Sequence, residues 1–181
     1  LDLNGELPRV IPNTKSSITR SGEDGEAVRM MTAMGQGETQ VSPYHMALIA
    51  SSIANGGTLM EPYLIEAVTN YTGTVIKEYR PEEYGKLMTS QEAAQLKAYM
   101  QDVTDYGTGS VFAGSGYSVA GKTGTAEYAD GDSSRNHSWF VGFTDVDNPE
   151  LAICVIVEQS DGGTRAVDGA KEILDLSRIP I

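Results

Sequence analysis

Hydrophobic and polar positions along this chain change their spacing several times, and each spacing predicts a different element. The first clear segment is 42–57, where most positions between Ser42-Pro43 and Gly56-Gly57 are apolar. A serine followed by proline is typical of a helix N-cap and the first helical position, and glycine commonly follows the last turn. The pattern therefore predicts a buried helix with almost no polar face.

Two further segments have the one-sided apolar spacing of amphipathic helices. Thr89 and Glu92 stand three residues apart, as in a capping box, and apolar residues follow at helical intervals until Gly107. The segment 165–177 separates an apolar face from a charged one. Its apolar positions are Val167, Ala170 and Leu174, and its charged positions are Asp168, Lys171 and Asp175. We predict one helix from about 89 to 107 and a closing helix at 165–177.

Strand-like stretches fill the space between these helices. Residues 63–69 and 74–79 are rich in β-branched and aromatic side chains and flank Thr72-Gly73, a pattern that predicts a hairpin. Residues 117–127, 137–145 and 151–159 read as three more strands joined by short turns, so we expect antiparallel neighbours. The elements together predict an α/β mixed (α+β) fold, with an antiparallel sheet flanked by helices.

The chain divides into three regions within one predicted domain. Residues 1–41 are rich in Gly, Pro, Ser and Thr without a sustained period, and we predict an irregular connecting region there. Residues 42–116 hold helices plus the hairpin, and residues 117–181 hold three strands and the closing helix. Trp139 and Phe140 lie on opposite faces of the second strand of the last region, and we expect Trp139 to pack in the core.

Composition excludes some classes of function. The 181 residues contain 13 Lys+Arg and 25 Asp+Glu, which gives a net charge of −12. Nucleic-acid binding by charge needs clustered basic residues, so we expect no nucleic-acid partner. The two histidines are far apart in the sequence and indicate no metal site, and no cofactor is expected. The one cysteine, Cys154, lies in an apolar run and is expected to be an inert buried thiol.

Two interpretations compete for Lys122. The stretch from Gly116 to Thr123 satisfies the letters of a phosphate loop, which would make the chain a nucleotide-binding protein. A phosphate loop requires a strand before it and a helix directly after it, yet Gly124 follows Thr123, and glycine is a poor first turn of a helix. The stretch 117–127 reads more naturally as a strand that contains Lys122-Thr123-Gly124.

The Lys-Thr-Gly triplet is typical of penicillin-binding proteins and class A β-lactamases. Further motifs of that family occur here in the family's order. They are Gly35-Gln36-Gly37-Glu38, Val41-Ser42-Pro43, Ile53-Ala54-Asn55-Gly56-Gly57, Ala120-Gly121-Lys122-Thr123-Gly124-Thr125-Ala126-Glu127 and Ser138-Trp139-Phe140-Val141-Gly142-Phe143. The chain resembles the C-terminal half of the transpeptidase domain of a class B high-molecular-weight penicillin-binding protein. The resemblance covers nearly all of residues 1–181 and implies part of the penicillin-binding-protein/serine β-lactamase-like transpeptidase fold.

The resemblance also implies a function and roles for four residues. Proteins of this family cross-link peptidoglycan by transferring the acyl group of a D-Ala-D-Ala stem peptide through a serine, and β-lactams acylate the same serine. Lys122 would supply a positive field, and the Thr123 and Thr125 hydroxyls would hold the ligand's carboxylate. The backbone N–H of Thr125 would stabilise the oxyanion, and Gly124 would leave room for an extended acyl chain.

The family's nucleophile motif, Ser-x-x-Lys, is absent from the sequence, and Ser134-Arg135-Asn136 matches the accompanying Ser-x-Asn motif only by letters. We therefore expect a chain that is inactive alone, with both motifs in a preceding half of the same domain that binds it. Association of the chain with itself is an alternative way to cover the exposed apolar surface. The family also implies an extracytoplasmic location with a membrane anchor upstream. A non-catalytic β-lactam-sensing or scaffold domain of the same fold remains the alternative function.

Overall fold

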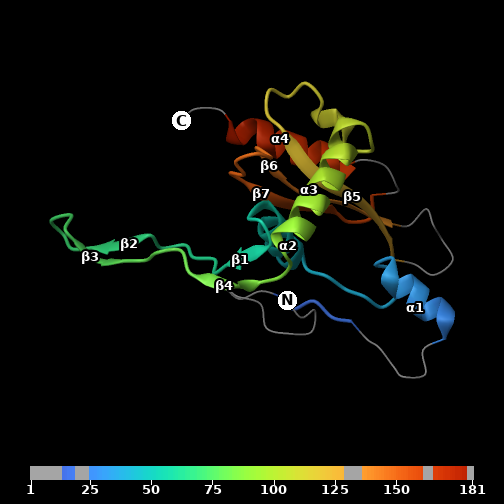
Figure 1. The fold of residues 1–181 in the computed structure, drawn as a ribbon, viewed down its shortest axis with the longest axis horizontal. Coiled ribbons are helices and arrows are strands. Elements are labelled where there is room, and N and C mark those ends of the chain that lie inside the picture. Colours follow the sequence, from blue (N-terminus) through green and yellow to red (C-terminus); the bar gives the residue numbers. More distant parts are fainter. Residues whose placement is uncertain (1–13, 19–24, 129–135, 161–164, 179–181) are drawn as a thin grey trace.

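The computed structural model describes residues 14–18, 25–128, 136–160 and 165–178. Its body has three layers (Figure 1). The middle layer is an antiparallel sheet with the order β5-β6-β7, formed by β5 (Val119–Glu127), β6 (Asn136–Thr144) and β7 (Ala152–Val157). Helices α2 (Pro43–Ala54) and α3 (Ser90–Asp105) pack on one face, and α4 (Arg165–Ser177) packs on the other. The predicted fold class, the three strands and the closing helix are confirmed.

Local capping signals begin both helices of the first layer. The side chain of Ser42 accepts a hydrogen bond from the backbone N–H of His45 at 3.2 Å, with Pro43 in the first turn of α2. At α3, Thr89 Oγ1 accepts from Glu92 N at 3.2 Å while Glu92 Oε2 accepts from Thr89 N at 2.8 Å. Each bond satisfies a backbone N–H that the first helical turn leaves without a partner. Both predicted helix starts are confirmed.

Two apolar clusters fix the helices to the sheet. On the α4 face, Phe140 is fully buried with Phe112, which belongs to the short 3-10 helix η1 (Ser110–Phe112), and with Leu174 of α4. On the α2–α3 face, Phe143 packs with Ile53 and Met100. Trp139 is only half-buried, so the prediction that it packs in the core is wrong. Alternation along the strand places Trp139 and Phe140 on opposite faces of the sheet. Because helices cover both faces, the alternation does not show which of the two side chains is buried more completely.

A long arm extends from the body (Figure 1). At its base β1 (Thr58–Met60) pairs with β4 (Glu83–Lys86), and further out β2 (Ala67–Thr69) pairs with β3 (Val75–Glu78), both antiparallel. The outer pair confirms the predicted hairpin, including its turn, where Gly73 has a φ of +84°. The β1–β4 pair was not predicted, because strands this short show too few alternations to be recognised.

The prediction of irregular structure over 1–41 is wrong for α1 (Glu26–Ala33). This helix has no buried residue, and its N-cap, Gly25, makes no side-chain capping bond. The sequence therefore lacks the capping signal that begins α2 and α3, and the apolar side chains of α1, among them Val28 and Met31, are exposed. Residues 1–13 and 19–24 of this region lie outside the described ranges.

Candidate active site

The segment Lys122-Thr123-Gly124-Thr125 lies in the middle of β5. The strand continues to Glu127 without a helix after the lysine, so the stretch from Gly116 is not a phosphate loop, which needs a strand-to-helix turn at this place. β5 is an edge strand, because β6 is its only partner among the strands of the described residues. All four residues that the resemblance assigned to the site therefore lie on one exposed strand edge.

Hydrogen bonding shows which backbone groups of β5 point outward. Asp145 N donates to Ser118 O at 2.8 Å, which makes Ser118 a residue bonded toward β6. In an antiparallel pair the bonded residues alternate, so the N–H and C=O groups of Thr123 and Thr125 point to the free edge. The partners of two carbonyls agree: Thr123 O accepts from Lys122 Nζ at 2.6 Å, and Thr125 O accepts from Gln36 Nε2 at 3.0 Å.

The side chains alternate between the two faces of the sheet. Lys122 and Gly124 share the face that α2 and α3 cover, since their register partners are Val141 and Trp139. Thr123 pairs with Phe140 and lies on the α4 side. A positive charge and a hydroxyl thus flank the outward-pointing backbone groups from opposite faces of the same strand.

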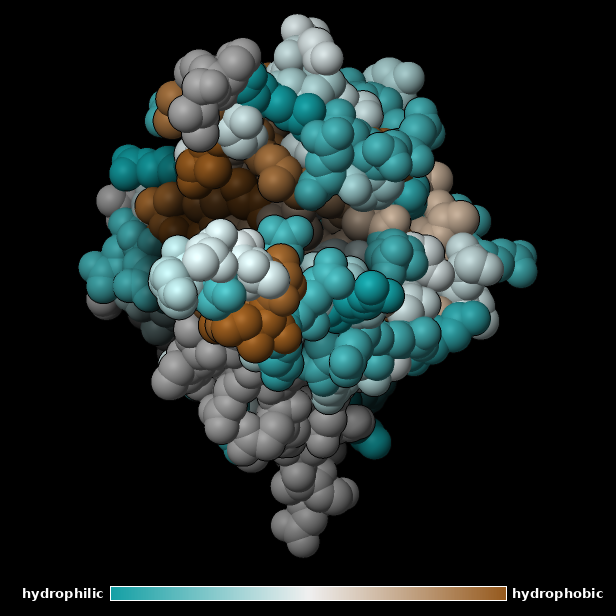
Figure 2. Space-filling view, turned by 90° about the vertical axis from the view of Figure 1, so that its left-hand side faces the viewer, coloured by the Kyte–Doolittle hydropathy of each residue, from teal (hydrophilic) through white to brown (hydrophobic). Residues whose placement is uncertain are grey.

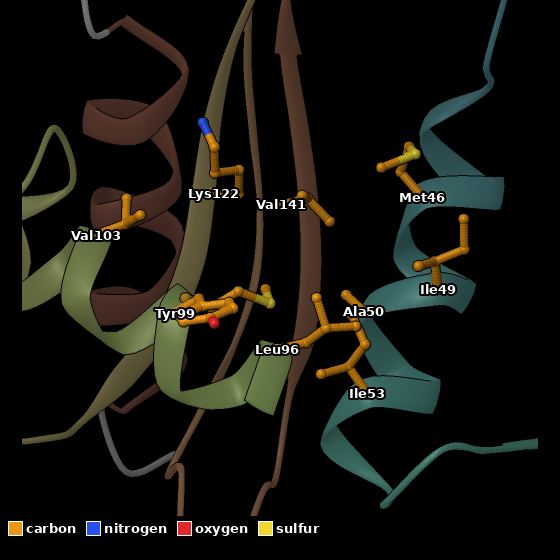
Figure 3. A pocket seen from close by; sticks show the side chains of 10 residues that line it. Met46, Ile49, Ala50, Ile53, Leu96, Tyr99, Val103, Lys122 and Val141 are labelled. Carbon is orange, nitrogen blue, oxygen red and sulfur yellow. The ribbon is translucent and has the colours of Figure 1, made fainter. Parts of the chain in front are cut away.

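An apolar pocket of about 360 Å³ lies beside Lys122. Figure 3 shows side chains of α2 on one side of it and side chains of α3 on the other, with Lys122 and Val141 of the sheet between them. The lining residues are Met46, Ile49, Ala50, Ile53, Leu96, Tyr99, Met100, Val103, Lys122 and Val141. Among these described residues, Lys122 is the one that carries a charge. Figure 2, which looks at the molecule from the side of the arm, shows apolar residues in brown, some of them in a hollow.

Thr108 and Gln36 join the site although sequence reasoning assigned them no role. Thr108 follows α3, and its Oγ1 lies 2.6 Å from Thr123 Oγ1. The two hydroxyls hold each other in position, and one of their two protons stays available for another acceptor. The Gly107-Thr108-Gly109 stretch was a visible signal, as was Gly35-Gln36-Gly37, but neither pattern shows which strand it contacts.

Glycine at two positions lets the strand pack closely. A Cβ on Gly121 would overlap the ring of Phe140, and a Cβ on Gly124 would come within 3.3 Å of Trp139 Cβ. The absence of a side chain at Gly121 therefore leaves room for the buried Phe140 ring. At Gly124 it leaves the face of the strand that carries Lys122 without a protruding side chain next to the lysine.

The one cysteine, Cys154, is not a reactive nucleophile, and the described residues contain no metal cluster. Burial raises the pKa of the Cys154 thiol to about 11, so the thiolate that would attack a carbonyl is scarce at neutral pH. No group of three or more His, Cys, Asp or Glu in the described ranges is arranged to hold a metal ion.

Helices on both faces of an antiparallel sheet, with a Lys-Thr-Gly strand at its free edge, are typical of the serine acyltransferases that react with penicillin. Residues 7–175 match the family model described as the penicillin binding protein transpeptidase domain. The chain belongs to the penicillin-binding protein transpeptidase family.

Named relatives agree with this assignment. The chain is 33% identical over 164 residues to the peptidoglycan D,D-transpeptidase PbpA of Mycolicibacterium smegmatis, covering 87% of this chain and 32% of the relative. It is 28% identical to the peptidoglycan D,D-transpeptidase MrdA of Acinetobacter baumannii, covering 97% of this chain and 28% of that protein. These relatives confirm the expected class B type. The chain spans about a third of their length.

Solved structures agree on the fold. The imipenem acyl-enzyme complex of penicillin-binding protein A from M. tuberculosis superposes with a TM-score of 0.74 at 27% identity, covering 91% of this chain and 36% of that one. Penicillin-binding protein 2B from Streptococcus pneumoniae gives a TM-score of 0.78 at 24% identity, covering 92% of this chain and 29% of that one. None of the helices in the described part of the chain has the length and apolar content of a membrane span.

Proposed function

We propose that this chain forms one wall of the active site of a serine-type D,D-transpeptidase that cross-links peptidoglycan stem peptides and is acylated by β-lactams. The observation that carries the proposal is the free edge of β5, where the backbone groups of Thr123 and Thr125 point outward beside Lys122. An edge strand with outward N–H and C=O groups binds an extended peptide by continuing the sheet.

The proposed roles follow from the charges and donors at this edge. The Lys122 ammonium attracts the carboxylate of a D-Ala-D-Ala donor or a β-lactam, and the Thr123 and Thr125 hydroxyls donate hydrogen bonds to it. The outward N–H of Thr125 donates to the oxyanion that develops when the serine attacks the carbonyl. The bond between Lys122 Nζ and Thr123 O is formed by a flexible side chain, so the ammonium can turn toward a ligand.

The serine itself lies outside these 181 residues in the proposal. No Ser-x-x-Lys occurs in the sequence, and the chain spans about a third of its relatives. The pocket beside Lys122 is the place where we propose that the segment carrying the serine packs, because its lining is apolar and its one charged residue is the proposed active-site lysine. The chain alone is then predicted to be inactive.

The location and partners of the whole protein follow from the same proposal. Peptidoglycan stem peptides are cross-linked outside the cytoplasmic membrane, so we propose an extracytoplasmic domain with a membrane anchor outside this chain. The partners are the donor and acceptor stem peptides, β-lactams and the remaining part of the same transpeptidase domain. Self-association of the isolated chain through the apolar pocket is the competing way to bury that surface.

The test is the rate of acylation by benzylpenicillin, measured by intact-mass spectrometry. The 181-residue chain alone should gain no mass. A polypeptide that also contains the Ser-x-x-Lys and Ser-x-Asn motifs should be acylated once, and Lys122→Ala should slow that reaction by about 10²–10³-fold, as expected when a preorganised electrostatic contact is removed.

Lys86→Ala is the matched control, because Lys86 is an exposed lysine on β4 of the arm. It should leave the acylation rate unchanged. Equal acylation rates for the Lys122 and Lys86 variants would refute the proposal that the Lys-Thr-Gly strand forms a wall of the active site. Acylation at normal rate without any turnover of stem peptide would favour the β-lactam-sensing alternative.

A further inference from the structure

The Gly35-Gln36-Gly37 motif places a side-chain amide on the free edge of β5. Gln36 Nε2 donates to the carbonyl oxygen of Thr125 at 3.0 Å, across 89 residues of sequence. That carbonyl is one of the outward-pointing groups of the edge strand. The contact therefore occupies a hydrogen-bond acceptor on the surface where an extended ligand is proposed to lie.

The chain around Gln36 is shaped to present this amide. Helix α1 ends in a left-handed turn: Gly35 has a φ of +80°, and the backbone N–H of Gln36 donates to Met31 O at 2.9 Å. Gly37 follows with a φ of +75°. Two glycines in conformations that other residues rarely adopt thus hold Gln36 between them and project its side chain toward β5. Apart from this bond, α1 has no buried residue to fix its place.

The carboxamide of Gln36 has the same donor chemistry as a peptide N–H. A strand added to the edge of β5 would donate a backbone N–H to Thr125 O and accept from Thr125 N, as neighbouring strands do. Both donors approach the same carbonyl from the free edge. An incoming amide and the Gln36 amide therefore compete for one position.

We propose that Gln36 is a displaceable plug of the ligand edge, by which we mean the free edge of β5 at Thr123 and Thr125. Its side-chain amide stays hydrogen-bonded to the Thr125 carbonyl until the amide of an extended peptide or of a β-lactam replaces it. This inference rests on the proposed function, because it takes the β5 edge as the ligand-binding surface. It makes Gln36 a residue that sets ligand affinity without contacting the reacting atoms. Loss of its amide removes a competitor rather than a ligand contact, so affinity should rise.

The first test needs no ligand. The carbonyl ¹³C resonance of Thr125 is measured by NMR in the 181-residue chain and in Gln36→Ala. Loss of the hydrogen bond should move this resonance upfield, while Gln95→Ala, which removes an exposed glutamine of α3, should leave it in place. An unchanged Thr125 resonance in Gln36→Ala would show that the contact does not exist in solution and would overturn the plug.

The second test is a titration of the same ¹⁵N-labelled chains with diacetyl-Lys-D-Ala-D-Ala and with benzylpenicillin, observed at the Thr125 amide. A net hydrogen bond of the usual strength predicts that Gln36→Ala binds about twofold to tenfold more tightly than the wild-type chain. Gln36→Met should behave alike, since it keeps the bulk of the side chain and removes the donor. Gln95→Ala should match the wild type.

The outcomes separate the plug from the proposed function. Binding by the wild-type chain with equal or weaker binding by both Gln36 variants overturns the plug and leaves the ligand edge intact. If no variant of the 181-residue chain binds either ligand, the comparison is repeated with the polypeptide that also contains the Ser-x-x-Lys and Ser-x-Asn motifs. The absence of both binding and acylation there overturns the ligand edge and, with it, the plug. Tighter binding by Gln36→Ala but not by Gln36→Met would mean that the size of the Gln36 side chain, and not its hydrogen bond, limits binding. That result would also overturn the plug.

Discussion

The body and the arm of this protein are both built from antiparallel strands, yet different forces hold them. In the body, β6 has most of its residues buried between α2 and α3 on one side and α4 on the other. In the arm, every residue of β2 and β3 is exposed. Burial of apolar surface therefore stabilises the body, and it contributes little to the outer arm.

The arm depends on local polar contacts instead. The Asn70 carboxamide oxygen accepts from Thr72 N at 3.0 Å, from Thr74 N at 2.9 Å and from Thr72 Oγ1 at 2.7 Å. Lys77 Nζ lies 4.2 Å from the centre of the Tyr79 ring. These contacts join residues close in sequence, so they form without the rest of the fold.

The candidate site is positioned by the body of the protein and not by the outer part of the arm. β5 is held by its register with β6 and by the buried Phe140 and Phe143 behind it, whereas the outer β2–β3 pair of the arm belongs to none of the apolar clusters. Substitutions in the body should therefore change global stability and the geometry of Lys122. Equivalent substitutions in the outer β2–β3 pair should change only that pair.

The largest expected effect is the loss of the Phe140 ring. Phe140 is fully buried, and Phe140→Ala should lower the free energy of unfolding by about 3–5 kcal/mol in urea denaturation followed by circular dichroism. Ile76→Ala removes a large apolar side chain from the arm, where Ile76 is 69% exposed, and should cost less than about 0.5 kcal/mol. Phe140→Leu retains part of the packing and provides a measurable variant if the alanine chain does not fold. Similar losses in Phe140→Leu and Ile76→Ala would remove the distinction between body and arm.

A smaller effect is expected where a methyl group is added to the body. The new Cβ in Gly121→Ala would overlap the buried Phe140 ring, and overpacking of this kind costs about 1–3 kcal/mol. Gly85→Ala in β4 is the matched control, because a Cβ there meets nothing within 4 Å. The same denaturation experiment should show a loss for Gly121→Ala and none for Gly85→Ala. An unaltered Gly121→Ala midpoint would mean that the ring moves freely and that the site strand is less tightly supported than its burial indicates.

The sequence predicted those parts of the fold whose signals are local. Ser42-Pro43 and the Thr89–Glu92 box define helix starts by bonds within three residues, and the structure contains both. The α1 helix escaped prediction because it has neither a capping side chain nor a buried residue. The burial of Phe140 rather than Trp139 escaped prediction because it depends on contacts with distant elements. Local propensity and alternation carry no information about such contacts.

The candidate site shows the same division. Lys122, Thr123, Gly124 and Thr125 are consecutive, so the motif by itself is enough to predict that they share one strand. Gln36 and Thr108 reach that strand from other parts of the chain, and their contacts exist only once β5 lies at the edge of the sheet. A short motif identifies residues within one element. Which residues contact that element is decided by the packing of the whole fold, which the motif does not show.

The smallest effect on global stability should come from the turn of the arm, where the local consequence is large. Asn70→Ala removes the acceptor of three hydrogen bonds, so the β2–β3 pair should open and the backbone N–H groups of Thr72 and Thr74 should lose their protection from hydrogen exchange. Asn148→Ala, in the turn between β6 and β7, is the matched control and should leave the arm protected. Because the outer β2–β3 pair contributes no residue to the apolar clusters of the body, the urea midpoint should not move in either variant. A midpoint that falls with Asn70→Ala would show that the arm and the body unfold as one unit, and the contrast between them would then be one of exposure alone.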